Sequence, residues 1–137
     1  YYFNGVANKW FKNYDLAINS LNMGVEFVLD NKMLLLEFYS SLADSYHVIK
    51  EHKLSDEYYE KSLVIDSNNV LVLNNYAYYL SLRKINLEKA KKMSYKCNEL
   101  EKENCTYQDT YAWILYELAD YEQAKCGCKN HEQTEGI

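Results

Sequence analysis

The sequence predicts an all-α protein built from antiparallel pairs of helices, on three observations. The 137-residue chain contains no proline and only four glycines, so residues 25–126 carry none of the punctuation that strands and hairpins leave. Apolar residues in this stretch recur three and four positions apart, which is the spacing of one face of a helix. The pattern of large and small residues then repeats about every 35 positions, which is typical of stacked helical pairs.

The apolar periodicity marks one helix in each of three segments. The recurring residues are Phe38, Leu42, Tyr46 and Ile49; Leu73, Tyr76 and Leu80; and Tyr107, Tyr111, Ile114 and Leu118. Polar clusters at residues 50–53, 66–69, 83–86 and 101–104 separate the segments from their neighbours. We therefore expect helices of about 14 to 16 residues joined by short turns.

Small residues fall at matching positions of successive segments. Ala17, Ser55, Ala90 and Ala124 are separated by 38, 35 and 34 positions. Seven residues beyond each of the first three comes a second small residue, and these are Gly24, Ser62 and Cys97. Because a small side chain lets two helix backbones approach closely, these positions predict where paired helices cross.

This arrangement, with a large residue and an alanine on a first helix and a small, large, small series on a second, resembles the tetratricopeptide repeat. The clearest copy is LADSYHVIKEHKLSDEYYEKSLVIDSNN at residues 42–69. Another is YAWILYELADYEQA at residues 111–124, with Tyr121 in the aromatic position beside the turn. The resemblance covers nearly the whole chain and implies one domain over residues 1–137, a right-handed superhelix of about three to four repeats. Its units would span about 1–31 (partial), 35–69, 70–104 and 105–130, with a polar tail at 129–137.

The chain departs from the family pattern at the ends of its units. The proline that usually closes each unit is replaced by Ser67 and Lys102, and Ser55 stands where alanine is commonest. The first copy has also lost the start of its first helix. The stretches NNYAYYL and DTYAWIL look like those of bacterial tetratricopeptide proteins of the Bacteroides kind.

Composition excludes some classes of partner. A net charge of -5 argues against nucleic acid, because proteins that bind its phosphates concentrate lysine and arginine. No apolar run approaches the roughly 20 residues that span a bilayer, so we expect no membrane insertion. The chain begins Tyr1-Tyr2-Phe3 without a methionine, and we expect it to start inside a longer polypeptide. Its location is then cytoplasmic or, if an upstream signal was removed, bacterial periplasmic.

The tyrosines divide between packing and exposure. The large residues expected on the packing sides of the first helices are Tyr46, Tyr76, Tyr79, Leu80 and Tyr111. Tyr78 follows Tyr76 by two positions, which is a rotation of about 200° on a helix, so it cannot share that packing face. We expect Tyr78 to point into the concave side of the predicted superhelix.

The resemblance implies a groove along the first helices of the units. The residues that the repeat frame places along it are Tyr2, Val6, Lys9 and Trp10; Glu37, Ser40, Asp44 and His47; Asn74, Tyr78, Ser81 and Leu82; and Asp109, Trp113, Tyr116 and Glu117. Aromatic walls with a few polar groups are typical of surfaces that bind protein segments, because rings contribute a large contact area at a small entropic cost.

The groove lacks the cations that some members of this family use to hold a partner's C-terminal carboxylate. The corresponding positions are Ser40, Asp44, Asn75, Thr106 and Thr110, of which only Asn75 matches. Asp44 and Asp109 would repel a carboxylate. We therefore expect a protein or peptide partner with basic and apolar residues.

No arrangement in the sequence indicates catalysis or a cofactor. His47 lies one turn from Asp44, but Ser40 and Ser41 are on the same strip of that helix, so no nucleophile faces the histidine. The three potential ligands Cys126, Cys128 and His131 lack the second spaced pair of a structural zinc site. We expect reduced thiols, no metal and no cofactor.

The sequence thus predicts a non-catalytic protein–protein interaction module, or scaffold, that holds a peptide segment of a partner in its concave groove. Two alternatives stay open. One is structural self-association as a homo-oligomer such as a homodimer, and the other is a spacer within a longer chain.

Overall fold

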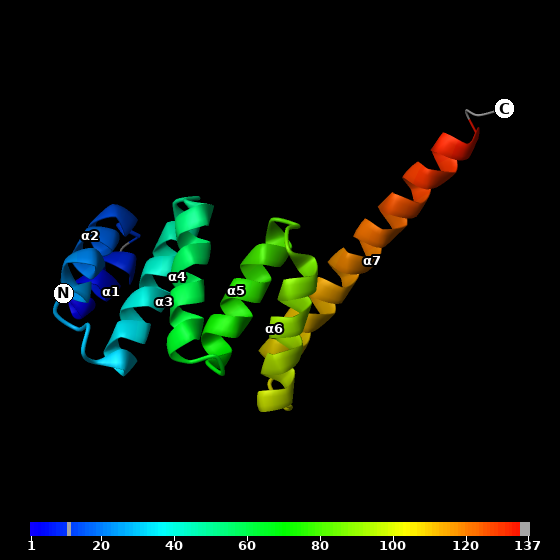
Figure 1. Cartoon of the computed structure of the whole chain (residues 1–137). Coiled ribbons are helices and arrows are strands. Elements are labelled where there is room, and N and C mark those ends of the chain that lie inside the picture. Colours follow the sequence, from blue (N-terminus) through cyan, green and yellow to red (C-terminus); the bar gives the residue numbers. More distant parts are fainter. Residues whose placement is uncertain (11, 135–137) are drawn as a thin grey trace. The chain divides into compact units, whose positions relative to one another are not determined.

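The computed structural model describes residues 1–10 and 12–134, with side chains for residues 1–10, 12–120 and 122. Within these residues it contains seven α-helices and no strand (Figure 1), which confirms the predicted all-α class. The helices are α1 (Tyr2–Trp10), α2 (Tyr14–Val25), α3 (Lys32–Val48), α4 (His52–Ile65), α5 (Val70–Leu82), α6 (Leu87–Leu100) and α7 (Cys105–Thr134).

The chain divides into two compact units, Tyr1–Val72 and Leu73–Ile137. The first unit holds α1 to α4, and the second holds most of α5 together with α6 and α7. A single domain over residues 1–137, as expected from the sequence, stays a prediction.

In the first unit, α1 packs against α2, α3 packs against α4, and α2 also contacts α3 (Figure 1). The core between α2 and α3 consists of Ile18, Leu21, Phe38 and Leu42. Three half-buried polar residues from three helices extend this core. The ring centroids of Tyr46 and Tyr58 lie 5.6 Å apart, and Asn22 donates to the Tyr46 hydroxyl and accepts from the Tyr58 hydroxyl. These tyrosines therefore stabilise helix packing.

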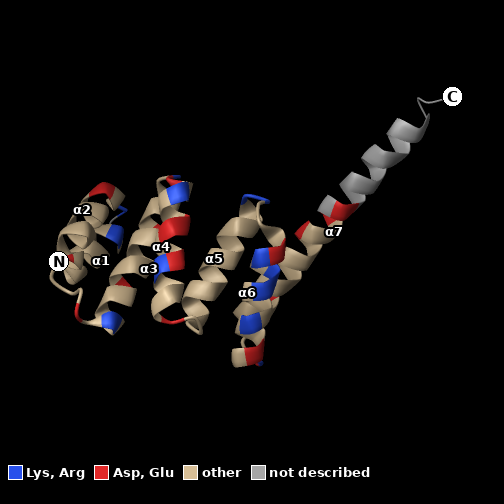
Figure 2. Cartoon of the chain, in the orientation of Figure 1, with Lys and Arg blue, Asp and Glu red and all other residues tan. Residues whose placement is uncertain are grey.

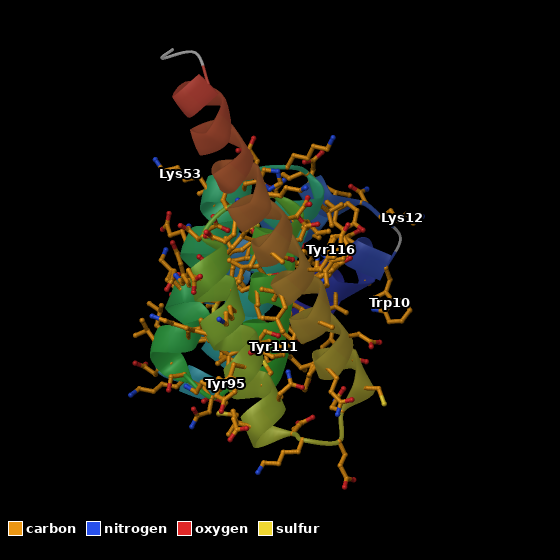
Figure 3. The ribbon with its side chains drawn as sticks, turned by 90° about the vertical axis from the view of Figure 1, so that its right-hand side faces the viewer. Trp10, Lys12, Lys53, Tyr95, Tyr111 and Tyr116 are labelled. Atoms are coloured by element: carbon orange, nitrogen blue, oxygen red, sulfur yellow. The ribbon has the colours of Figure 1, made fainter. Side chains whose placement is uncertain are left out.

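In the second unit, α5 buries Tyr76, Ala77 and Leu80, as the repeat pattern predicted for Tyr76 and Leu80. Lys89 Nζ of α6 lies 5.0 Å above the centre of the Tyr76 ring, a cation–π distance. Helices α6 and α7 also pack together. Asn98 Nδ2 of α6 donates to the backbone oxygen of Tyr107 on α7 over 3.0 Å, and Tyr95 and Tyr111 meet across the same pair of helices (Figure 3).

The small residues lie where the sequence predicted close crossings of helices. The six that the structure describes, Ala17, Gly24, Ser55, Ser62, Ala90 and Cys97, are all buried. At Gly24 an added Cβ would lie 2.3 Å from Phe38 Cε1, a distance that no real contact allows. Ser55 Oγ donates to the backbone oxygen of Ala43 on the neighbouring helix over 2.8 Å. The side chain is thus short enough to touch the facing backbone.

The turns inside the three hairpins share one backbone geometry that was not predicted from the sequence. Each contains a lysine in the left-handed backbone region, and these are Lys12 (φ 59°), Lys50 (φ 66°) and Lys84 (φ 55°). The next residue donates its N–H to the carbonyl five positions back: Asn13 to Asn8, Glu51 to Tyr46, and Ile85 to Leu80. This is the Schellman ending of a helix, in which glycine is the usual left-handed residue.

The turns between hairpins are closed by asparagine. The side-chain oxygens of Asn31, Asn69 and Asn104 accept hydrogen bonds from the backbone N–H groups of Leu34, Val72 and Tyr107, three positions ahead. An asparagine in this position satisfies one of the unpaired N–H groups at a helix start. The asparagines are spaced 38 and 35 positions apart, as are Ala17, Ser55 and Ala90. They define the starts of α3, α5 and α7 although the family's proline is missing.

The fourth unit differs from the predicted helical pair. Helix α7 runs unbroken from Cys105 to Thr134, where the alignment expected a turn beside Tyr121. Residues 105–126 contain neither glycine nor proline, so the backbone has no residue that favours leaving the helix. Ala112, which aligns with the buried Ala77, is correspondingly exposed. The side chains of Tyr121 and Ala124 lie outside the described residues.

Replacement of Lys50 by glycine should raise the free energy of unfolding by about 0.5–1 kcal/mol. A side chain in the left-handed region costs about 1 kcal/mol, and glycine avoids that cost. The same substitution at Lys53, an exposed residue in the first turn of α4 (Figure 3), should instead lower it by up to about 1 kcal/mol. Urea denaturation followed by circular dichroism measures both. Equal losses for the two variants would contradict the turn geometry.

Candidate functional site

One hollow in each unit holds predicted site residues: the first lies mainly along α1, and the second lies between α5 and α7. The first-unit hollow has a volume of about 450 Å³ and is lined by Tyr2, Val6, Lys9, Trp10, Tyr14 and Ser41. The second-unit hollow has a volume of about 420 Å³ and is lined by Asn74, Tyr78, Thr106, Asp109, Thr110 and Trp113. Charged side chains gather elsewhere, on α4 and α6, whereas α5 carries none (Figure 2).

Helix α1 forms most of the first-unit hollow. Lys9 Nζ lies 2.8 Å from Asp44 Oδ2 of α3, and the hydroxyl of Tyr59 donates a hydrogen bond to Asp44 Oδ1. The sequence placed the negative charge of Asp44 in a groove. In the structure Lys9 of the same unit neutralises that charge. Trp10 is 82% exposed, and Figure 3 shows its side chain pointing away from the ribbon. The first-unit hollow thus has an exposed aromatic ring at its edge, and its lysine is already paired with an aspartate of the same unit.

Tyr2 is also engaged within the first unit. Its hydroxyl donates to Glu37 Oε2 over 3.2 Å, and its ring lies 5.3 Å from that of Phe38. Partial burial raises the pKa of Tyr2 above its ordinary value, and the negative charge of Glu37 raises it further. The hydroxyl therefore stays protonated, and remains a donor to Glu37, at any pH near neutrality.

Two aromatic rings form the walls of the second-unit hollow. Tyr78 of α5 and Trp113 of α7 are each 39% exposed. The Tyr78 ring centroid lies 5.9 Å from that of Tyr79, and the Trp113 centroid lies 5.8 Å from that of Tyr116. Each wall is therefore supported by a neighbouring ring on its own helix. As the sequence predicted, Tyr78 does not share the buried face of Tyr76.

The polar groups of the second-unit hollow are an exposed carboxylate, a buried amide and two threonines. Asp109 is exposed, and no lysine or arginine lines the hollow with it. Asn74 is 8% exposed, and its Oδ1 accepts no hydrogen bond from the described residues. An amide oxygen buried without a donor costs about 1–3 kcal/mol of stability. Unpaired buried groups of this kind are uncommon in folded proteins and call for an explanation.

The structure brings half of the predicted groove residues into these two hollows. Tyr2, Val6, Lys9 and Trp10 share the first, and Asn74, Tyr78, Asp109 and Trp113 share the second. Tyr116 is exposed beside Trp113 without lining the hollow, and Ser40 and His47 are half-buried on α3. Glu117 is buried, with its Oε2 lying 3.1 Å from Lys84 Nζ. Ser81 is fully buried and its hydroxyl donates to the backbone oxygen of Tyr78, whereas Leu82 is exposed without lining the hollow.

Sequence reasoning left four lining residues off its list of site residues. Tyr14 and Ser41 join the first hollow, and Thr106 and Thr110 join the second. A signal existed for the two threonines, because they occupy the positions where some tetratricopeptide domains carry carboxylate-binding residues. Ser41 is the immediate neighbour of the predicted Ser40, so there the helical phase was misjudged by one residue.

The described residues bear on three sequence-based expectations, which concern metal binding, the state of the thiols and membrane insertion. Among the described residues, no group of histidine, cysteine and acidic side chains could hold a metal ion. Cys97 is buried and Cys105 is exposed, whereas the side chains of Cys126, Cys128 and His131 lie outside the described residues. None of the helices, as far as they are described, is long and apolar enough to cross a membrane.

Comparison with known proteins identifies the fold. No protein-family model matches the chain, and no curated protein matches it. A solved structure described as the first TPR of Spaghetti (RPAP3) bound to the HSP90 peptide SRMEEVD is similar over 86% of this chain and 90% of that chain. Its TM-score is 0.75 at 19% sequence identity. The chain therefore has the fold of a tetratricopeptide repeat domain, as its repeat pattern predicted.

The two described cysteines should differ strongly in reactivity. Burial raises the pKa of the Cys97 thiol to about 11, so its thiolate fraction at pH 8 is more than about 100-fold below that of an ordinary cysteine. Iodoacetamide at pH 8 should therefore modify Cys105 and leave Cys97 intact until urea unfolds the protein. Mass spectrometry of tryptic peptides separates the two sites. Similar modification rates of Cys97 and Cys105 in the folded protein would show that iodoacetamide reaches Cys97 on α6 without unfolding.

Proposed function

We propose that this chain is a non-catalytic protein–protein interaction module that binds a peptide segment of a partner on the first helices of its hairpins. The observation that carries the proposal is the second-unit hollow, whose two half-exposed rings flank an unpaired amide and an exposed carboxylate. Half-exposed aromatic walls favour a ligand with apolar groups. The similar domain bound to an HSP90 peptide supports the same mode of use.

The partner segment carries basic and apolar residues. The HSP90 peptide bound by the similar domain, SRMEEVD, ends in acidic residues. The second-unit hollow presents Asp109 and two threonines, and no cation lines it. A carboxylate placed there would meet repulsion from Asp109, whereas a cation would be attracted. The two chains share a fold and, on this proposal, differ in the charge of the segment they take.

A catalytic role finds no support in the same residues. Asp44, which the sequence set beside His47, is already held by Lys9 and Tyr59. It is therefore not available to orient the imidazole as the acid of a catalytic dyad. Ser40, a hydroxyl on that strip, donates to the backbone oxygen of Glu37 on its own helix.

A peptide library displayed on phage tests the proposal. Peptides enriched on the wild-type protein should lose at least about tenfold in affinity when Tyr78 or Trp113 is replaced by alanine, because hot-spot aromatics contribute 2 kcal/mol or more. Tyr95→Ala is the matched control, since Tyr95 is 53% exposed on α6 and does not line the hollow. Fluorescence anisotropy measures each affinity, and circular dichroism confirms that each variant is folded.

The comparison of the three variants decides the outcome. Equal affinities for wild type, Tyr78→Ala and Trp113→Ala would refute the second-unit hollow as the binding site. Loss on Tyr95→Ala alone would move the site to the face formed by α6 and α7.

Self-association is the second candidate, because large apolar side chains are exposed in the first unit. Phe3, Trp10, Phe27 and Met33 are each more than 70% exposed. A homodimer that covers them would remove apolar area from water and gain free energy. Gel filtration with light scattering separates the candidates, since a molar mass of one chain at every concentration excludes the dimer.

Origin from a bacterium of the Bacteroides kind stays a prediction.

A further inference from the structure

We propose that the second-unit hollow is a socket for one arginine side chain of the partner segment. This inference rests on the proposed function and names the residue that anchors the segment. It draws on three features of the hollow: its two aromatic lining residues, the sign of its charge and the unmet hydrogen bonding of its buried amide.

The walls suit a flat cation. Tyr78 and Trp113 come from different helices, are each 39% exposed, and line the same hollow of about 420 Å³. An arginine guanidinium is planar and weakly hydrated, so it stacks on aromatic faces and is attracted by their negative π-clouds. Tyr79 and Tyr116 back the two walls and hold the rings on their helices. The rings therefore offer stacking surface at a small loss of side-chain entropy.

The charge of the hollow is negative and has no partner in the described structure. Asp109 is exposed on α7, and the other lining residues are an asparagine, a tyrosine, a tryptophan and two threonines. Two other acidic residues that the sequence placed along the groove are already paired with a lysine: Asp44 with Lys9, and Glu117 with Lys84. Asp109 is thus the acidic residue of this hollow that can form a new ion pair. Arginine binds a carboxylate through two parallel hydrogen bonds.

The amide of Asn74 supplies the third contact. It is nine-tenths buried and lines the hollow, and its oxygen lacks a donor among the described residues. The amide oxygen and nitrogen exchange places by rotation about the Cβ–Cγ bond, so the oxygen can face an occupant. A guanidinium has five N–H donors, enough to reach both Asp109 and Asn74 while its plane rests on a ring. After that rotation, binding would give the amide oxygen a hydrogen-bond donor.

Other occupants use fewer of these features. A lysine ammonium pairs with Asp109 but has no plane to stack, and a quaternary ammonium fits the rings but has no hydrogen to donate to Asn74. A carboxylate is repelled by Asp109. The guanidinium is the group that uses the rings, the acid and the amide together.

Nuclear magnetic resonance with a small probe tests the socket without a known partner. The protein carries two tryptophans, so a Trp10→Phe variant leaves the indole N–H of Trp113 as the sole indole signal. Titration with N-acetyl-arginine N-methylamide should shift this signal saturably, with a dissociation constant in the millimolar range. The lysine and trimethyl-lysine analogues should bind at least about fivefold more weakly, in keeping with the loss of about 1 kcal/mol of stacking or hydrogen bonding.

Two variants report on the polar contacts, and a third serves as the control. Asp109→Asn should weaken the arginine probe at least about fivefold, whereas Asp120→Asn, which removes an exposed acid of the same helix outside the hollow, should leave it unchanged. Asn74→Leu should also weaken the probe while raising the melting temperature, because it removes a buried unsatisfied amide. A structural residue would show the opposite change in stability.

Each remaining outcome overturns the socket. No shift of the Trp113 signal, equal affinity for the lysine probe, or no effect of Asp109→Asn would each do so. The phage peptides judge the proposed function separately. If they bind through Tyr78 and Trp113 while the arginine probe fails, the interaction module stands and the arginine assignment falls.

Discussion

The fold depends on how closely two helix backbones can approach inside each hairpin. In the hairpin of α3 and α4, Ser55 Oγ reaches the backbone oxygen of Ala43 over 2.8 Å, and both side chains are almost fully buried. In the first hairpin an added Cβ at Gly5 would lie 3.4 Å from the backbone oxygen of Ala17, and Ala77 and Ala90, at the equivalent positions of α5 and α6, are both buried. Because interiors are close-packed, a larger side chain at these points has no space to enter. The crossing thus fixes which face α5 turns inward and which it leaves for Tyr78.

Periodicity and residue size in the sequence were sufficient to predict the first three helical pairs and the breaks between their helices. The predicted breaks at 66–69, 83–86 and 101–104 coincide with observed turns, the break at 50–53 overlaps a turn at 49–51, and Tyr76 and Leu80 are buried as expected. The turn chemistry was not predicted, because Lys12, Lys50 and Lys84 take a conformation that sequence reasoning assigns to glycine. The asparagine caps were also missed, although their spacing follows the repeat. The unbroken α7 shows the limit of alignment to a family, since a residue that marks a turn in relatives does not make one here.

The candidate site was predictable in its residues but not in its energetics. The helical phase of the sequence predicted that one surface is formed by Asn74, Tyr78, Asp109 and Trp113. In the structure these four residues line one hollow. Phase could not reveal that Asp44 is paired by Lys9 and Tyr59, or that Asn74 is buried without a donor for its oxygen, because both depend on contacts between helices. The carboxylate of Asp44 in the first unit is thus paired, whereas the amide oxygen of Asn74 in the second-unit hollow is not. A buried unpaired amide lowers the stability of the unbound fold, so an occupant that satisfies it gains that free energy on binding.

The central claim is that side-chain volume at the crossing, rather than hydrogen bonding, holds the hairpins together. The most direct measurement is the free energy of unfolding of two variants at Ser55, obtained by urea denaturation. Ser55→Ala removes one hydroxyl and should cost no more than about 1 kcal/mol, because a typical hydrogen bond contributes about that much. Ser55→Leu should cost about 3 kcal/mol or more, or prevent folding, since it overfills a crossing whose residue is 1% exposed. Equal costs for the two variants, or a leucine variant as stable as the wild type, would contradict the account.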